Sequence, residues 1–477
     1  MSKKIQYLRK KDINAVNDNL DSIIEKAQNQ KIQLIEPKLD EFLAVRDIIL
    51  NYIKNKKRII YGGYAWNELI KQKSPKDVFY KDTSYTDIEF YSNKPIEDLV
   101  KLCNILHNKK YKYIQGRNAQ HKDTYTIFVN FQQYCDISYM PSNIFNAVMT
   151  ENVDGLKLIH PKFIMVDILR QYNDPILSYW RIEKTIKRGK LLLENYPIEL
   201  CSNVIRIDKL NSLTLELIDD LLLHIVKMKS ILFFGQIATY AYLNPSINYK
   251  EQTTIYDNTQ LILMSSNLKN DVYIIYNLIL KYFIDNHKLD RINDSLKIEQ
   301  YFPFFQFTDK HVEIILDNKV FLIIYGTNEI CVQYNEINLN FKNNLYPIRI
   351  ACFNLLFMYN LIQYHRGYSL KDYQMKNHHD YQMYLLLNAK NNFLDKNNKT
   401  ILDETIFEDF KPNCMGTAVH PGIKVMLARY NRKLTPRSSI QSYSPEDNKI
   451  LNVDNYHFDN YSGNIINNPK ELVYNIK

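Results

Sequence analysis

The segment RIIYGGYAWNELI, from Arg58 to Ile70, restricts the possible fold more than any other part of this sequence. A short apolar run meets two adjacent glycines, and a helical pattern follows. Glycine is scarce, with 11 in 477 residues, so a pair marks a place where the backbone turns sharply or approaches another group closely. We expect a strand over Arg58–Tyr61, a turn at Gly62-Gly63 and a helix over Tyr64–Lys71.

The flanking patterns extend this unit into a small α/β domain. Helical spacing predicts a helix over Pro37–Lys54, before the glycines. After them, Thr86–Ser92 (TDIEFYS) alternates like a strand, Ile96–Leu106 repeats like a helix, and Thr124–Met140 is long enough for one long strand or two. Pro161–Arg188 then predicts one or two helices beside the sheet. This order indicates an α/β (α+β) fold.

Composition bounds the class of protein. With 477 residues and 45% hydrophobic content, the chain allows two to four packed domains. The N-terminus lacks an apolar signal core and no apolar run is long enough to span a bilayer, so we expect a soluble intracellular protein with no membrane partner. Six cysteines lie far apart without a C-x-x-C pair, so we expect free thiols, mostly buried. The net charge of +9 is compatible with a nucleic-acid partner but does not require one.

Carboxylates gather around the glycine turn in this prediction. Asp87 and Glu89 project to one face of a strand, while their neighbours face the core. Their charges repel each other, and a divalent cation relieves the repulsion; an all-oxygen ligand set favours Mg²⁺ over zinc. Asp136, in a later strand with apolar or small neighbours, completes a candidate triad. A Gly-Gly pair alone is usually only a turn, and D-x-E alone is common on solvated strands, so the combination carries the prediction.

The turn and the triad together favour nucleotidyl transfer. A glycine turn that opens a helix presents backbone N–H groups to phosphate oxygens, with no Cβ in the way. Two carboxylate-held metal ions activate an attacking hydroxyl and neutralise a leaving pyrophosphate. We therefore expect Asp87, Glu89 and Asp136 to be catalytic metal ligands, with Gly62 and Gly63 cradling a triphosphate.

These motifs resemble the DNA polymerase β nucleotidyltransferase superfamily. Within it, IIYGGYAWNELI, TDIEFYS, QYCDISYMP and HPKFIMVDILRQYNDP…YWRIEK resemble the viral poly(A) polymerase catalytic subunits of poxviruses and giant DNA viruses, over Ile59–Lys187. The sequence departs from the pattern in the distance from Gly63 to Asp87, which is 24 residues and longer than usual; we expect an extended loop there. The frequent serine after the glycine is also absent, so backbone amides would make more of the phosphate contacts.

The resemblance implies a template-independent poly(A) polymerase. Such an enzyme adds AMP from ATP to the 3′-hydroxyl of mRNA and releases pyrophosphate, with two Mg²⁺ or Mn²⁺ ions. By this resemblance, Asp87 and Glu89 hold both ions, and Asp136 holds the ion that activates the hydroxyl. The implied partners are ATP, the RNA 3′ end, and a second copy of the chain or a second viral subunit. The implied location is the host cytoplasm, a viral factory or the virion.

Two alternatives from other classes remain open. One is a different nucleotidyltransferase, such as a CCA-adding enzyme or a small-molecule adenylyltransferase, although length and basicity argue against the latter. The other is a non-catalytic RNA-binding scaffold, which the intact triad argues against.

Basic and polar groups supply further candidates. A basic group that follows the triad is expected to contact the nucleotide, with a solvated face as the equal alternative: Lys162, Arg181 and Lys184, with Lys187 and Arg188 nearby. A basic C-terminal arm is expected to contact RNA through phosphate charges: Arg429, Arg432, Lys433 and Arg437. Asp167 and Arg170 predict a helix salt bridge. His378-His379-Asp380 lacks a metal-ligand partner and is expected to lie at the surface.

The second half of the chain echoes the first without its carboxylates. Three segments resemble the three motifs above: Ser230–Leu243, Thr259–Leu280 and Lys319–Tyr334. In this alignment Gln260 replaces Asp87, Ile262 replaces Glu89, and Cys331 lies near the position of Asp136. Chance similarity of two α/β segments is the alternative. The expected organisation is an extension (1–36), a catalytic domain (37–190), a degenerate nucleotidyltransferase-like domain (191–385) and a helical or loop-like C-terminal extension (386–477).

Overall fold

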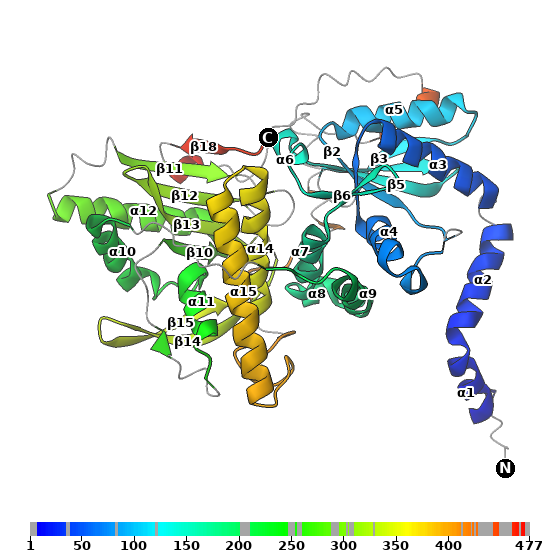
Figure 1. Ribbon diagram of the computed structural model, residues 1–477. Helices are drawn as coiled ribbons and strands as arrows, with labels where there is room; N and C mark the ends of the chain where they lie inside the picture. Colours follow the sequence, from blue (N-terminus) through cyan, green and yellow to red (C-terminus); the bar gives the residue numbers. More distant parts are fainter. Residues whose placement is uncertain are drawn as a thin grey trace, which may run out of the picture.

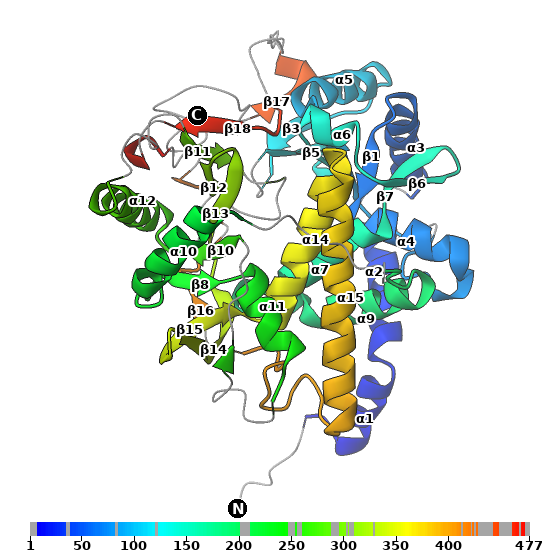
Figure 2. The same ribbon diagram turned by 60° about the vertical axis from the view of Figure 1, so that its left-hand side comes forward.

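The computed structural model of the protein describes residues 7–34, 39–81, 84–119, 123–200, 210–246, 253–254, 260–287, 295–301, 304, 310–327, 330–411, 414–420, 422–423, 426–427, 442–447, 460–466 and 469–472. The fold is mixed α/β, as expected, with two β-sheets and helices packed on them (Figures 1 and 2). Among the helices in these ranges, none combines the length and the apolar character that crossing a membrane requires.

The first sheet comes from the N-terminal half of the chain. Its strand order is β6-β7-β1-β2-β5-β4-β3. Helices α3 and α5 pack together, as do α4, α7 and α9. The elements of this half are α1 (Lys10–Asp18), α2 (Leu20–Leu34), α3 (Leu39–Asn55), β1 (Ile59–Tyr61), α4 (Gly62–Lys73), η1 (Pro75–Asp77), β2 (Ile88–Ser92), α5 (Pro95–Asn108), β3 (Gln115–Asn118), β4 (Thr124–Val129), β5 (Gln132–Tyr139), α6 (Ser142–Phe145), β6 (Thr150–Val153), β7 (Leu156–Ile159), α7 (Pro161–Tyr172), α8 (Pro175–Ser178), η2 (Tyr179–Arg181) and α9 (Ile182–Asn195).

The second sheet comes from the following half, in the order β14-β15-β8-β10-β13-β12-β11. Its elements are α10 (Ser212–Ile225), β8 (Ile231–Phe233), α11 (Gly235–Leu243), β9 (Thr253–Thr254), β10 (Leu261–Ser265), α12 (Leu268–Asp285), β11 (Leu296–Tyr301), β12 (His311–Leu316), β13 (Lys319–Gly326), β14 (Val332–Phe341), β15 (Asn344–Ala351), α14 (Phe353–Ser369) and α15 (Tyr373–Lys396). The C-terminal region adds β16 (Cys414–Met415), β17 (Ser442–Tyr443), η4 (Pro445–Asp447), β18 (Gly463–Ile466) and η6 (Pro469–Glu471).

The two sheets have the same topology, which confirms the predicted tandem arrangement. Read from β6 in the first sheet and from β14 in the second, each strand has its counterpart in the same place and order. β1 and β8 are both antiparallel to the next strand of the order, β2 and β10. The C-terminal region extends both sheets at the equivalent edge, with β17 on β3 and β18 on β11. A shared topology of this detail excludes chance similarity between two α/β segments.

The local structure repeats as well. Gly62 and Gly235, the first residues of α4 and α11, have positive φ angles of 69° and 59°. At the end of the second motif strand, a serine hydroxyl donates to an aspartate six residues later in both halves: Ser92 to Asp98 and Ser265 to Asp271, each at 2.5 Å. The same residue types, a glycine at the turn and a serine and an aspartate after the strand, therefore shape the backbone at equivalent places in both domains.

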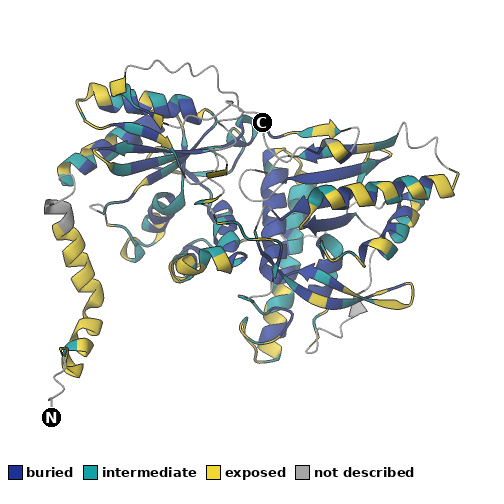
Figure 3. Ribbon diagram, turned by 180° about the vertical axis from the view of Figure 1, so that it is seen from behind, coloured by how far each residue is buried: buried dark blue, intermediate teal, exposed yellow. Residues whose placement is uncertain are grey.

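Helices α14 and α15 form a hairpin between the two sheets, and α14 packs against α7 of the first domain (Figures 1 and 2). The expected division after residue 385 falls inside α15, which is continuous over Tyr373–Lys396. At the other end of the chain, α1 and α2 extend away from the first domain and are mostly exposed (Figure 3).

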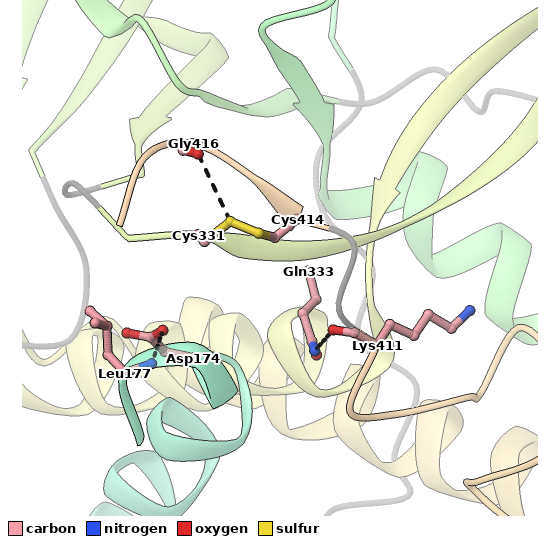
Figure 4. The surroundings of a disulfide bond; sticks show 7 residues. All are labelled: Asp174, Leu177, Cys331, Gln333, Lys411, Cys414 and Gly416. Carbon is pink, nitrogen blue, oxygen red and sulfur yellow. Dashed lines mark hydrogen bonds between the residues drawn. A yellow bond between two sulfur atoms is a disulfide. The ribbon is translucent and has the colours of Figure 1, made fainter. Parts of the chain in front are cut away.

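The cysteine prediction needs a correction. Cys331 and Cys414 form a disulfide whose Cα atoms are 5.2 Å apart (Figure 4). Their strands β14 and β16 pair, and 83 residues separate the two cysteines in sequence, so spacing alone could not reveal the bond. Three other cysteines are free and buried, as expected: Cys103, Cys135 and Cys352.

Candidate active site

The three predicted carboxylates come from neighbouring strands of the first sheet. Asp87 directly precedes β2, and Glu89 lies in it. β2 pairs in parallel with β5, and Glu89 lies directly opposite Asp136. Ile88 and Phe90 are buried in the core, at 1% and 0% exposure. The predicted alternation of this strand is therefore correct, and tertiary structure places Asp136 on the carboxylate face.

Gln133 joins the carboxylates, although the sequence did not indicate it. Its Nε2 donates to Asp87 Oδ2 at 3.2 Å and to Asp136 Oδ1 at 3.4 Å. Strict alternation would put residues 133 and 136 on opposite faces of β5. An irregularity in the β4–β5 pairing shifts the register between Ile127 and Phe128, which returns Gln133 to the face of Asp136. Thr126 on β4 lies opposite Asp136 and donates its hydroxyl to Oδ1 at 2.5 Å.

The glycine turn and Glu89 are in direct contact. The backbone N–H of Gly63 donates to Glu89 Oε2 at 3.0 Å. A Cβ at Gly62 would lie 1.5 Å from the same oxygen, so any other residue would displace the Glu89 carboxylate, and the positive φ of Gly62 is a second reason for glycine. The turn therefore presents a backbone donor to an acidic oxygen of Glu89, and its contact with a triphosphate stays a prediction.

Burial and mutual repulsion perturb two of the carboxyl groups. Burial, with the charge of Asp87 second, raises the pKa of Glu89 to about 8, against the opposing hydrogen bond from Gly63. Burial also raises the pKa of Asp136 to about 6, although the hydrogen bond from Thr126 lowers it. Buried acids of this kind favour either a proton or a cation.

The donor chemistry of this group fits divalent cations, because three carboxylates supply hard oxygen ligands. In the part of the chain that the structure describes, no basic side chain forms an ion pair with any of the three. Their arrangement is not a closed metal cage: across the described ranges, no three carboxylate, imidazole or thiol groups lie close enough together to hold an ion. Glu89 instead contacts the glycine turn. Two Mg²⁺ or Mn²⁺ ions at this site remain a prediction.

Two of the predicted basic residues face the carboxylates. Arg181 ends η2 and Lys184 lies in α9. Partial burial and the charges of Arg188 and Arg181 lower the pKa of Lys184, while Glu89 and Asp87 raise it. Burial and Arg170 lower the pKa of Arg181, while Glu89 and Asp167 raise it. Both cations therefore lie within electrostatic reach of the acidic group.

The helical positions 181, 184 and 188 share one face, and the structure distinguishes them from the other lysines of α9. Lys187 pairs with Glu183 at 2.7 Å, and Lys190 pairs with Glu194 at 3.7 Å. Among the described residues, the three cations of the shared face make no ion pair within 4.0 Å. Within the described ranges no ion pair joins these cations to Asp87, Glu89 or Asp136, so both groups remain candidates for binding charged ligands.

The long segment between the two motifs folds back over the glycine turn. Asn67 of α4 fixes it: its Oδ1 accepts from Phe79 N at 3.0 Å and from Tyr80 N at 2.8 Å. The guanidinium of Arg188 lies over both rings, 3.9 Å from the Phe79 centroid and 4.8 Å from that of Tyr80. A Cβ at Gly63 would be 3.0 Å from the Tyr80 hydroxyl. The described part of the expected loop up to residue 81 therefore packs beside the glycine turn.

Lys162, the third predicted nucleotide contact, has other partners. Its ammonium lies 3.3 Å from Asp380 Oδ1 and 4.5 Å from the ring centroid of Tyr364, both in the second domain. The pair makes an interdomain contact. The expectation that His378-His379-Asp380 lies at the surface is wrong, because His378 and Asp380 are 9% and 6% exposed. The packing of α15 on α14 buries them.

Of two other predictions, one is confirmed and one stays untested. The salt bridge between Asp167 and Arg170 is confirmed at 3.1 Å. The C-terminal basic cluster lies outside the described residues, so its RNA contact stays a prediction: Arg429, Arg432, Lys433 and Arg437.

The equivalent site of the second domain lacks carboxylates on the two matching strands. Ile262 on β10 matches Glu89, and its side chain lies against Gly235 as Glu89 lies against Gly62. The residue paired with Ile262 is Ile323 on β13, which corrects the predicted counterpart of Asp136. Cys331 lies before β14, at the far edge of the sheet, because β13 ends at Gly326.

Comparisons with known families agree with this architecture. The family model described as "Poly(A) polymerase catalytic subunit" matches residues 47–178. A second model, described as "APMV, Putative poly(A) polymerase, catalytic subunit, C-terminal", matches residues 194–476. The two matches lie on the first and second domains.

Individual relatives point the same way. A protein of Acanthamoeba polyphaga mimivirus named "Putative poly(A) polymerase catalytic subunit" is 30% identical over 98% of this chain and 85% of its own length. One from African swine fever virus (isolate Pig/Kenya/KEN-50/1950) is 29% identical over 35% of this chain and 37% of its own. The crystal structure of the Megavirus polyadenylate synthase superposes with a TM-score of 0.85, at 29% identity, covering all of this chain and 96% of that one.

Proposed function

Because this chain belongs to the poly(A) polymerase catalytic subunit family, as the match over residues 194–476 and the full-length mimivirus relative show, we propose that it adds AMP from ATP to the 3′-hydroxyl of mRNA without a template. The single observation that carries this proposal is the register of β2 and β5. It sets Glu89 opposite Asp136, with Asp87 at the strand entrance.

The reaction moves one nucleotidyl group. The 3′-oxygen of the RNA forms a bond to the α-phosphorus of ATP, the bond from that phosphorus to the bridging oxygen breaks, and pyrophosphate leaves. Two divalent cations would supply activation of the hydroxyl and charge neutralisation of the pyrophosphate. In this proposal Asp87 and Glu89 hold both ions and Asp136 holds the one nearer the hydroxyl.

The other residues position the substrate and hold charge. Gly62 and Gly63 offer backbone N–H groups to the triphosphate. The hydrogen bond from Gly63 N–H to Glu89 supports this role, because it shows that this N–H group can donate to an acidic oxygen. Arg181 at the end of η2 and Lys184 of α9 contact the triphosphate oxygens. Gln133 and Thr126 fix the orientation of the carboxylates through the hydrogen bonds described above.

A primer-extension assay tests the proposal. The purified chain is incubated with an RNA primer, Mg²⁺ or Mn²⁺, and each of the four nucleoside triphosphates in turn. We expect long extension with ATP and release of pyrophosphate. Extension limited to two cytidylates and one adenylate would identify a CCA-adding enzyme instead. RNA binding without turnover under both metals would support a non-catalytic scaffold.

A further inference from the structure

The chain contains two tryptophans, and they lie in opposite environments. Trp66 on α4 is 7% exposed and belongs to the core, whereas Trp180 on η2 is 64% exposed. Its neighbour Tyr179 is 72% exposed. Large aromatic side chains contribute most to folding when they are buried. Two adjacent exposed rings therefore contribute little to the stability of the fold, and a ligand is the alternative reason for them.

The turn that carries these rings is firmly anchored. Asp174 accepts a hydrogen bond from Leu177 N at 3.3 Å and so begins α8 (Figure 4). Asn173, 1% exposed, donates to Leu169 O at 2.8 Å, and its Oδ1 accepts from the Cys352 thiol of the second domain at 3.3 Å. Both domains thus fix the base of the turn. A rigid base is what a stacking surface needs, because little ordering entropy is lost on binding.

Arg181 connects the two rings to the transfer site. Its guanidinium carbon lies 4.3 Å from the Trp180 ring centroid, and its charge interacts with Glu89 and Asp167. Lys184 and Arg188 continue the same helix face without acidic partners at ion-pair distance among the described residues. The Tyr179 ring and the exposed part of Trp180, beside cations that form no ion pair among the described residues, suit a ligand that carries both flat bases and phosphates.

We propose that Tyr179 and Trp180 form a stacking platform for an adenine base beside the transfer site. This inference rests on the proposed function, which brings adenine there from two sources, ATP and the 3′ end of the growing tail. A protein partner would also cover apolar rings, but the adjacent unpaired cations favour a phosphate-bearing ligand. Stacking on an aromatic side chain holds any base, and a purine offers the larger face.

The tryptophans themselves supply the test, since Trp66 is buried and Trp180 is the exposed fluorophore. Oligoadenylate alone, or ATP alone, is titrated into the full chain while tryptophan fluorescence is recorded; neither mixture supports transfer. We expect one or both ligands to change the emission. A response to oligoadenylate assigns the platform to the tail, and a response to ATP assigns it to the incoming nucleotide.

Variants show whether Tyr179 and Trp180 stack on a ligand or are only exposed to solvent. Trp180→Ala and Tyr179→Ala should each weaken binding of the responding ligand by about fivefold to about 100-fold, measured by a filter or calorimetric assay. Trp180→Phe keeps a ring and should retain most of the affinity while losing the fluorescence change. Tyr373→Ala is the matched control, because Tyr373 is an exposed aromatic residue too, at 60%, but lies on α15. This variant should bind both ligands as the wild type does.

Three results would overturn the platform. One is wild-type emission that responds to neither ligand, and another is Trp180→Ala binding both ligands with wild-type affinity. The third is a Trp180→Ala variant whose mass in solution changes while its ligand affinities do not, which would assign the rings to a protein contact. Asp87→Asn keeps the proposals distinguishable: it should bind oligoadenylate as the wild type does but fail to transfer. If the wild type binds with a fluorescence change yet extends no primer, the proposed function fails and the platform stands.

Discussion

Glu89 and Asp136 lie opposite each other on β2 and β5 of the first domain, and Ile262 and Ile323 occupy the matching pair of the second. On the neighbouring strand, β4 in the first domain and β12 in the second, it is the second domain that carries the acid. Thr126 of β4 lies opposite Asp136, whereas Glu313 of β12 lies opposite Ile323. Each domain therefore carries acid on the same sheet face, but on different strands.

The two acids have opposite electrostatic environments. Burial raises the pKa of Glu313 too, but its hydrogen bond with His311 and the charge and hydrogen bond of Arg366 outweigh burial and hold that pKa at about 2. The His311 and Arg366 nitrogens lie 3.1 Å and 3.0 Å from Glu313 Oε1. Within the described residues, no such ion pair reaches Asp87, Glu89 or Asp136, and burial raises the pKa of Glu89 to about 8. The second domain thus neutralises its acid through an internal ion pair, whereas the acids of the first domain remain the proposed ligands of divalent cations.

The largest expected effect is the loss of catalysis in the first domain. Asp87→Asn, Glu89→Gln and Asp136→Asn should each lower turnover by several orders of magnitude, because metal-bound charge stabilises the transition state. The fold should survive, since each change also removes repulsion. Primer extension and thermal melting on the same preparations check both points. Near-normal tailing by Asp87→Asn would reject the assignment of the site.

The next largest effect concerns the internal pair of the second domain. Arg366→Met leaves the buried Glu313 without its guanidinium, so we expect about 3–5 kcal/mol of destabilisation. Adding Glu313→Gln should recover part of it, because the unpaired charge is then gone. Urea unfolding measures both variants. Lys187→Ala, which breaks an exposed pair, is the control and should cost at most about 1 kcal/mol.

A test of the degenerate pair should show a smaller loss. Ile262 is 8% exposed, and Ile262→Glu would bury an unpaired carboxylate at a cost of roughly a few kcal/mol. It should not create a second active site, because Ile323 still faces it. Gln260→Ala should leave tailing nearly unchanged. If Gln260→Ala abolished tailing in a well-folded protein, the second domain could not be called catalytically silent.

The acid sensitivity of the two domains should differ as well. The pKa of Glu313 falls from 4.5 to about 2 on folding, so its contribution to stability is complete above the unfolded value. It is lost as pH drops from about 4.5 through about 2, where Glu313 becomes protonated. Stability measured against pH should therefore fall less steeply over this range in Glu313→Gln than in the wild type. Equal slopes would show that the pair is not the source.

The smallest expected effect separates the two faces of α9. Lys184→Ala should raise the KM for ATP by about tenfold with kcat changed less, since one charged contact to the triphosphate is lost. Lys187→Ala and Lys190→Ala remove lysines that already pair with glutamates, so the KM should not change. If all three variants changed the KM for ATP equally, Lys184 would be an ordinary solvent-exposed lysine and not a contact of the triphosphate.

The sequence alone determined the local frame of this protein. Strand and helix periods are written in neighbouring residues, so Ile88 and Phe90 could be assigned to the core and Asp87 and Glu89 to one face. The glycine turn could be predicted because glycine lacks a Cβ. The same turn occurs at Gly235, in the sheet that has the same topology. Each of these inferences depends on spacings of a few residues.

Tertiary structure decided every contact between residues distant in the chain. Strand order set Ile323, and not Cys331, at the counterpart of Asp136. A register shift brought Gln133 to the carboxylates, domain packing took Lys162 to Asp380, and pairing of β14 with β16 closed the disulfide. Such contacts depend on which elements pack together, and that choice minimises the free energy of the whole chain, so no short stretch of sequence specifies it.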